Sequence, residues 1–138
     1  MAGFGIQRVN LLYMHSSTSS EVGKRAENAV AEALTARGLR ILARNVRRRY
    51  GEIDLVAQDR DTIVFVEVRA RRRGALVPPE ETVGWQKKRR IAMVAASFLS
   101  CHHLDDTPCR LDVAAVEVLP GGSIGTVRLF ENAFQIDW

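Results

Sequence analysis

Two acidic side chains interrupt two otherwise apolar runs of the chain. Asp54 stands in an Ile-Asp-Leu-Val run and Glu67 in a Val-Phe-Val-Glu-Val run. If the runs pair as an antiparallel hairpin in which Gln58 faces Ile63, the same register places Asp54 directly opposite Glu67. Side chains opposite each other share a face, with Cβ atoms about 5 Å apart. Two carboxylates so placed repel each other unless a cation lies between them.

A carboxylate pair of this kind suits a hard divalent cation. Mg²⁺ takes oxygen ligands, commonly one or two carboxylates completed by waters and phosphate oxygens. In phosphodiester hydrolysis such an ion orients the phosphate, lowers the pKa of a bound water and neutralises charge on the leaving oxygen. Arg69 follows Glu67 by two residues and so shares its face of the strand, where a cation is placed to bind phosphate. The sequence therefore predicts a Mg²⁺ or Mn²⁺ site at Asp54 and Glu67. The alternative is that both acids form structural salt bridges with nearby arginines.

Basic residues are concentrated in the middle of the chain. The 138 residues carry a net charge of +4, but the segment from Arg37 to Arg90 holds fifteen Lys and Arg against seven Asp and Glu. That segment is therefore strongly positive and the remainder mildly negative, which favours nucleic acid, DNA first, as the partner. The candidate contacts are Arg47, Arg48, Arg49, Arg71, Arg72, Arg73 and Lys88. Arginine runs can also be ordinary solvated faces, and this alternative stays open.

Two aromatic residues lie beside the basic runs. Tyr50 follows the 47–49 arginines and Trp85 precedes Lys87. Aromatic side chains next to cations stack on unpaired bases in single-strand binding. Ordinary packing explains them equally well at this level.

Hydrophobic periodicity predicts the elements that must position these residues. Apolar residues at helical spacing, followed by Gly38, predict a helix over 21–37. A second helix is expected from about Thr82 to Ser100, after the Pro78-Pro79 break. Short β-rich runs predict strands over 40–46, 52–57, 62–68, 111–119 and 126–130. The order α-β-β-β-α-β-β indicates an α/β domain with a mixed sheet flanked by helices.

Length and composition bound the class of protein. A chain of 138 residues with 46% apolar and 26% charged residues can bury one core. We expect residues 1–20 to form a flexible N-terminal extension and residues 21–138 a single domain. No run approaches the roughly 18 apolar residues of a membrane span, so no membrane partner is expected. Two cysteines are too few for a disulfide scaffold, which favours the cytoplasm.

Several short motifs stand out along the chain: Gly-Lys-Arg-Ala-Glu at 23–27, Gly-Glu-Ile-Asp-Leu at 51–55, Phe-Val-Glu-Val-Arg at 65–69, Lys87, Arg-Leu-Asp-Val at 110–113 and Glu-Asn-Ala-Phe at 131–134. Together they resemble the YraN-like family of small bacterial proteins. That family is related to Holliday-junction resolvases and to the wider PD-(D/E)XK nucleases. The resemblance covers roughly residues 21–134 and implies a restriction-endonuclease-like fold. It also implies metal-dependent DNA hydrolysis and a homodimer acting on branched or structured DNA.

The resemblance assigns roles residue by residue. Glu27, Asp54 and Glu67 match the acids of the nuclease site, with Glu27 a third metal ligand or a group that orients water. Arg69 stands where the nuclease motif usually has lysine, and arginine cannot give up its proton to act as a base. Lys87 lies one turn before Ile91 and is placed to supply the missing lysine from the second helix.

Other residues leave alternatives open. Asp112 either supports the site or ends a turn, and Glu52 either reaches solvent or neighbours Arg69. Cys101, His102, His103 and Cys109 do not have a common zinc spacing, so a loop is expected there. Two further functional interpretations remain: a nucleic-acid-binding protein without catalysis, and a module that binds an acidic protein.

Overall fold

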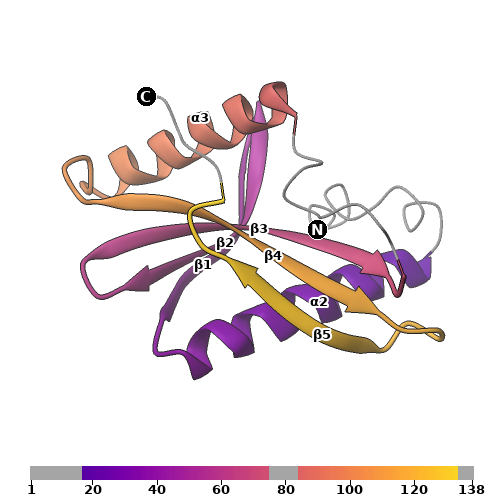
Figure 1. Cartoon of the computed structure of the whole chain (residues 1–138). Coiled ribbons are helices and arrows are strands. Elements are labelled where there is room, and N and C mark those ends of the chain that lie inside the picture. Colours follow the sequence, from indigo (N-terminus) through magenta and orange to yellow (C-terminus); the bar gives the residue numbers. More distant parts are fainter. Residues whose placement is uncertain (1–16, 75–83, 134–138) are drawn as a thin grey trace.

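The computed structural model describes residues 17–74 and 84–133, with side chains from residue 21 onward. Its elements are α2 (Ser17–Ala36), β1 (Arg40–Arg48), β2 (Gly51–Asp59), β3 (Thr62–Arg72), α3 (Trp85–Cys101), β4 (Cys109–Val118) and β5 (Ile124–Phe130). This order confirms the expected α/β class and is consistent with a restriction-endonuclease-like core (Figure 1).

The first helix begins earlier than its apolar pattern indicates. α2 starts at Ser17, so the last four residues of the expected extension are helical, while residues 1–16 lie outside the described residues. Serine and threonine are favoured at helix starts, which is why a polar cluster can be mistaken for a loop. At the other end Gly38 has a φ of +94° and Leu39 N donates to Leu34 O, as expected for a glycine stop.

The second helix starts at Trp85, with Gly84 at its N-cap. The Pro78-Pro79 break and the first predicted helical residue, Thr82, lie outside the described residues. No helix in the described ranges is both long and apolar enough to cross a membrane.

One five-stranded sheet runs in the order β1-β2-β3-β4-β5. Neighbouring strands are antiparallel except β3 and β4, which are parallel. Parallel neighbours need a long crossover, and the segment containing α3 supplies it. The short links between β1, β2 and β3 are antiparallel hairpins, as predicted.

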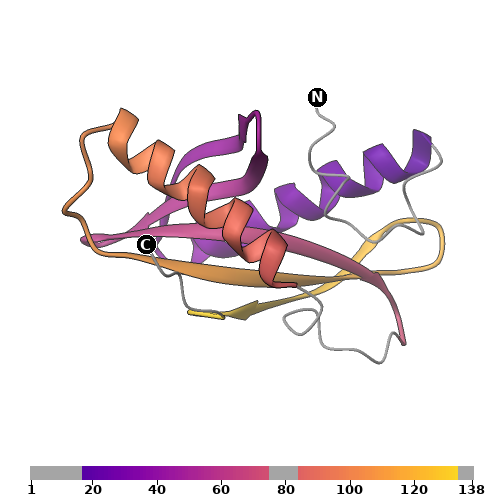
Figure 2. The ribbon, with the colours of Figure 1, turned by 90° about the horizontal axis from the view of Figure 1, so that it is seen from above.

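The helices lie on opposite faces of this sheet (Figures 1 and 2). On one face α2 contributes Val22, Ala26 and Val30 to a core with the inward side chains of β2–β4. On the other face α3 packs Ile91 and Phe98 into a second core. Successive residues of β3 alternate between the two cores, so the odd-numbered face of β3 is the one that meets α3.

The sheet forks at the position of the two predicted acids. The pairs Gln58–Ile63 and Val56–Phe65 confirm the predicted β2–β3 register, but the ladder ends at Leu55–Val66. Beyond that point β2 stays with β1 as far as Gly51, whereas β3 continues along β4. Figure 1 shows the β1–β2 turn rising away from the course of β3 and β4. Asp54 and Glu67 are the first residues after the ladder ends.

Candidate functional site

Glu67 is a buried carboxylate on the face of β3 that meets α3. Its side chain is 1% exposed, and Oε2 lies 2.7 Å from Lys87 Nζ and 3.8 Å from Arg69 Nη1. Its other oxygen, Oε1, is buried and accepts no hydrogen bond from the described residues. A charge removed from water requires compensation, which the two cations provide at one oxygen only. The second oxygen is therefore placed to take a further ligand.

Asp54 ties the two branches of the fork together. It is fully buried, and its Oδ2 accepts a 2.6 Å hydrogen bond from Val68 N. The carboxylate thus occupies the position of the strand carbonyl that the ended ladder no longer supplies. Because Val68 follows Glu67 directly, this bond places the Asp54 carboxylate beside the Glu67 backbone. Asp54 is therefore a structural link as well as a candidate ligand.

Lys87 comes from the first turn of α3. Buried Ile91, one turn later, fixes the rotation of the helix and directs Lys87 toward the sheet. Its ion pair with Glu67 brings a lysine from the second helix beside this strand acid.

Glu27 comes from the opposite layer. It is 6% exposed on α2, next to Ala26, which packs into the core under the other face of the sheet. Within residues 17–74 and 84–133 there is no group of three or more His, Cys, Asp or Glu side chains arranged to hold a metal. The described residues therefore bring Asp54 and Glu67 to the fork without completing the predicted three-carboxylate set.

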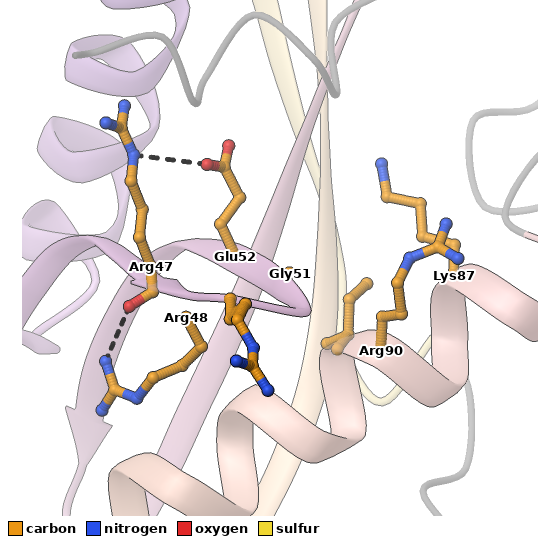
Figure 3. A pocket seen from close by; sticks show the side chains of 8 residues that line it. Arg47, Arg48, Gly51, Glu52, Lys87 and Arg90 are labelled. Atoms are coloured by element: carbon orange, nitrogen blue, oxygen red, sulfur yellow. Dashed lines mark hydrogen bonds and ion pairs between the residues drawn. The ribbon is translucent and has the colours of Figure 1, made fainter.

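A basic pocket of about 460 Å³ opens beside this site (Figure 3). Its basic lining residues are Arg47, Arg48, Arg49, Lys87 and Arg90. Gly51, Glu52 and Ile91 complete the lining. Figure 3 shows Lys87 and Arg90 on α3, across from the β1–β2 turn that carries the remaining labelled residues. Lys87 therefore belongs both to the pocket and to the Glu67 ion pair.

Close packing of the β1–β2 turn against α3 forms this pocket. A Cβ at Gly51 would lie 3.3 Å from Arg90 Cβ and 3.5 Å from Val94 Cγ2. Arg48 Nε also donates to Ser97 Oγ across the same seam, at 2.8 Å. The arginine run and the Gly51 position were visible in the sequence. Their contact with α3 was not, because no local pattern encodes the approach of a turn to a helix almost forty residues later.

The predicted basic contacts do not form one patch. The 47–49 arginines line the pocket, where Arg47 also pairs with Glu52 at 3.3 Å. Arg71, Arg72 and Arg73 continue along β3 past the site, and six residues of strand place Arg73 about 20 Å beyond Glu67.

Local partners engage part of the 71–73 run. Arg71 Nη1 donates to the carbonyl of Ala70, and Arg73 pairs with Glu117 at 3.0 Å. That Arg73 hydrogen bond lowers the pKa of Glu117. Lys88 adjoins Lys87 on α3 and is partly buried.

Asp112 belongs to a network at the start of β4. It accepts hydrogen bonds from Asn132 N at 2.8 Å and from Arg110 Nε at 3.1 Å. Arg110 also pairs with Asp59 at 3.2 Å. Burial raises the pKa of Asp112, although both hydrogen bonds act to lower it. These contacts join the start of β4 to the residues that follow β5, whereas Phe134 of the 131–134 motif lies outside the described residues.

The remaining candidates are on the surface. Trp85 is 67% exposed and Tyr50 37%, so neither is a core residue, and Tyr50 stands between two pocket residues in the turn. His102 stacks on Phe98 at the end of α3. Cys101 and Cys109 are both free thiols.

Comparison with known proteins gives the family. The model of the uncharacterised protein family UPF0102 matches residues 26–116, which include every acid of the candidate site. A UPF0102 protein of Symbiobacterium thermophilum is 49% identical over 117 residues, spanning 85% of this chain and 98% of that protein. A UPF0102 protein of Syntrophus aciditrophicus is 41% identical over 114 residues, spanning 83% and 88%. The chain therefore belongs to family UPF0102, the YraN-like family that its motifs resemble.

Proposed function

We propose that this protein binds nucleic acid, DNA first, and hydrolyses phosphodiester bonds with Mg²⁺ or Mn²⁺. The observation that carries the proposal is Glu67. It is a buried carboxylate with one oxygen available to a ligand, held by a lysine that also lines a strongly basic pocket. A carboxylate next to a surplus of cations is the arrangement expected where a metal and a phosphate meet.

The residues at the fork fit a hard divalent cation. Asp54 and Glu67 offer oxygen donors, and Mg²⁺ is commonly bound by one or two carboxylates with waters and substrate phosphates completing its shell. Glu27 is a candidate for a third ligand or a water-orienting group. The ion, when bound, would supply Lewis acidity and an acidified water.

The cations at the fork have distinct roles in this proposal. Arg69 remains charged and acts on the phosphate electrostatically, since its guanidinium does not exchange a proton at working pH. Lys87 is the one amine in contact with Glu67 among the described residues, so it is placed to bind phosphate when a ligand takes over the carboxylate. In this proposal the basic side chains around the site contact phosphates and not bases, so sequence-specific recognition is not part of it.

The family resemblance supports a narrower form of the proposal. Relatedness to Holliday-junction resolvases favours branched or structured DNA as the substrate and a homodimer as the active unit. Both are arguments by analogy with the fold.

Binding without hydrolysis is the second candidate. Arg69 in the usual lysine position favours it, and so does the lack of a three-carboxylate group in the described residues. A module that binds an acidic protein would share the basic surface but not the affinity for nucleic acid.

The test measures Mn²⁺ and Mg²⁺ binding by calorimetry for the wild type and for Asp54→Asn/Glu67→Gln. Single-stranded, duplex, flap and four-way DNA are incubated with each protein in parallel. Asp54→Asn keeps an oxygen that can accept the Val68 hydrogen bond, and both substitutions remove a negative charge. The exposed acids Glu32 and Asp105 provide a matched control, Glu32→Gln/Asp105→Asn.

The proposal expects metal binding and cleavage in the wild type and the control, and neither in the site variant. DNA binding with no metal binding in any variant would favour the non-catalytic candidate. Failure to bind DNA or RNA at low salt would reject both and favour the protein-binding module.

A further inference from the structure

The basic pocket has more positively charged side chains than acidic side chains to pair with them. Five of its eight lining residues are basic and one is acidic. Arg47 pairs with Glu52 and Lys87 with Glu67. For Arg49 and Arg90 the described part of the chain provides no ion pair. The pocket is therefore suited to a ligand with more than one negative charge.

The pocket also ends against packed protein. Buried Ile91 forms part of its wall, and the turn at Gly51 closes against Arg90 and Val94 of α3. A nucleic-acid strand that passes a binding surface continues on both sides of each phosphate, which suits an open groove. A pocket closed on one side by the turn and α3 instead suits the end of a strand.

A phosphate at the end of a strand carries more negative charge than a phosphate within the strand. A terminal phosphate monoester carries about −1.5 to −2 charges near neutral pH, because its second pKa is about 6. An internal phosphodiester carries one. Arginine forks bind such oxygens in pairs, so extra charge and an extra free oxygen both favour the monoester here.

We propose that this pocket binds the terminal phosphate monoester of a nucleic-acid strand, an inference that rests on the proposed function. Arg49 and Arg90 bind the phosphate from the turn and from α3. Tyr50 stands between Arg49 and Gly51 at the turn, where its exposed ring is placed to stack on the terminal base. Lys87 links the bound end to Glu67, so the acid site lies next to the strand end.

The experiment compares single-stranded oligonucleotides of one sequence that end in a 5′-phosphate, a 3′-phosphate or hydroxyls only. Fluorescence anisotropy measures their affinity in EDTA, where no metal-dependent cleavage occurs. The variant Arg49→Gln/Arg90→Gln removes the two pocket arginines. Arg37→Gln/Arg89→Gln removes the same charge from exposed positions outside the pocket lining.

We expect one or both phosphorylated ends to bind the wild type and the control about tenfold more tightly than the hydroxyl ends. The pocket variant should bind all three with equal affinity. The phosphorylated oligonucleotide that binds more tightly identifies the strand end that the pocket recognises.

Equal affinity of all three oligonucleotides for the wild type overturns the inference while leaving the proposed function intact. Retention of the phosphate preference by the pocket variant also overturns it. Absence of binding to every single-stranded oligonucleotide also overturns the inference; duplex and four-way DNA then test the proposed function separately, and inorganic phosphate titrated into both proteins reports on the pocket alone. A loss of phosphate binding in the pocket variant would support an anion site, and no binding to the wild type would reject one.

Discussion

Glu67 and Lys87 are an ion pair whose two ends have different surroundings. The Glu67 side chain is 1% exposed, while that of Lys87 is 27% exposed and reaches the pocket. Removing the lysine leaves a buried carboxylate with Arg69 at 3.8 Å. We expect Lys87→Met to lower the free energy of unfolding by about 1–3 kcal/mol, measured by urea denaturation.

A second substitution in this ion pair separates the interaction energy of the two side chains from the effect of each single change. Glu67→Gln added to Lys87→Met removes the stranded charge and should recover most of the lost stability, a coupling seen in a double-mutant cycle. Lys88→Met, one residue along, controls for loss of a lysine from α3. Additive effects of the two site substitutions would show that the pair is not coupled.

The pH dependence of stability carries a signature of Asp112. Burial raises its pKa in the folded protein above the ordinary value of 3.8. In the pH range between 3.8 and the folded-state pKa of Asp112, the folded state holds a proton on this carboxyl that the unfolded state has lost. The resulting stabilisation is complete below pH 3.8 and is lost as pH rises through the folded-state pKa. Relative to the wild type, Asp112→Asn should therefore gain stability as pH rises through this window.

Urea denaturation at a series of pH values checks this sign. Asp105→Asn, which replaces an exposed acid by the same amide, is the control substitution. A wild type that grows more stable than Asp112→Asn with rising pH would mean that Arg110 and Asn132 outweigh the burial of this carboxylate.

Individual residues were predictable where spacing alone determines their neighbours. Strand alternation placed Arg69 beside Glu67, and helical spacing placed Lys87 one turn before Ile91. The Asp112 network was undecided, because its partners Asp59 and Asn132 come from strand ends that are far apart in the chain. The role of Glu27 came from the resemblance, and its 6% exposure shows only that the side chain is buried.

At the scale of elements, the fork depends on the β1–β2 turn resting against α3. Gly51 has little space, with Arg90 Cβ 3.3 Å from the position of an added Cβ. We expect Gly51→Ala to be mildly destabilising and Gly51→Val to cost about 1–3 kcal/mol, because the larger side chain pushes the turn from the helix. DNA affinity should fall in the same order, since the pocket widens as the turn moves.

Thermal unfolding and anisotropy measure these two effects together. Gly84→Ala is the control, because a Cβ there meets nothing within 4 Å. Weaker DNA binding by Gly51→Val with unchanged stability would show that moving the turn away from α3 costs no stability. Unchanged binding with reduced stability would show that the pocket does not contact DNA.

Most elements followed from periodicity, and the errors are at their ends. All five strands were expected, but each differs at one end or both because pairing with a neighbour extends a strand beyond its apolar residues. The β2–β3 register was correct up to Leu55–Val66. Its end was not predictable, because beyond it β2 stays with β1 while β3 continues along β4, a partner that no local pattern identifies.

At the scale of the whole molecule, the basic middle of the sequence is divided between two places. The 47–49 arginines line the pocket and the 71–73 arginines lie toward the far end of β3. Replacing the 47–49 arginines by Gln should reduce the slope of log affinity against log salt by roughly 1 to 2 units, since Arg47 is paired with Glu52 and each phosphate contact contributes about 0.9. The same change at 71–73 should reduce it by less than one.

Anisotropy titrations with duplex DNA over a range of salt concentrations measure both slopes. The two triple variants lose equal charge, so each serves as the control for the other. Equal reductions would indicate a contact surface that follows β3 along the sheet instead of one centred on the pocket.

The parallel pairing of β3 with β4 makes the site depend on the crossover that joins them. β1, β2 and β3 are consecutive hairpins whose contacts close short loops, whereas β4 reaches β3 only after the whole crossover has been ordered. Lys87 and the α3 wall of the pocket belong to that crossover. Without α3 in place, Glu67 would face water and the pocket would lack one wall. The acid site and the pocket therefore depend on the same packing of α3 against the sheet.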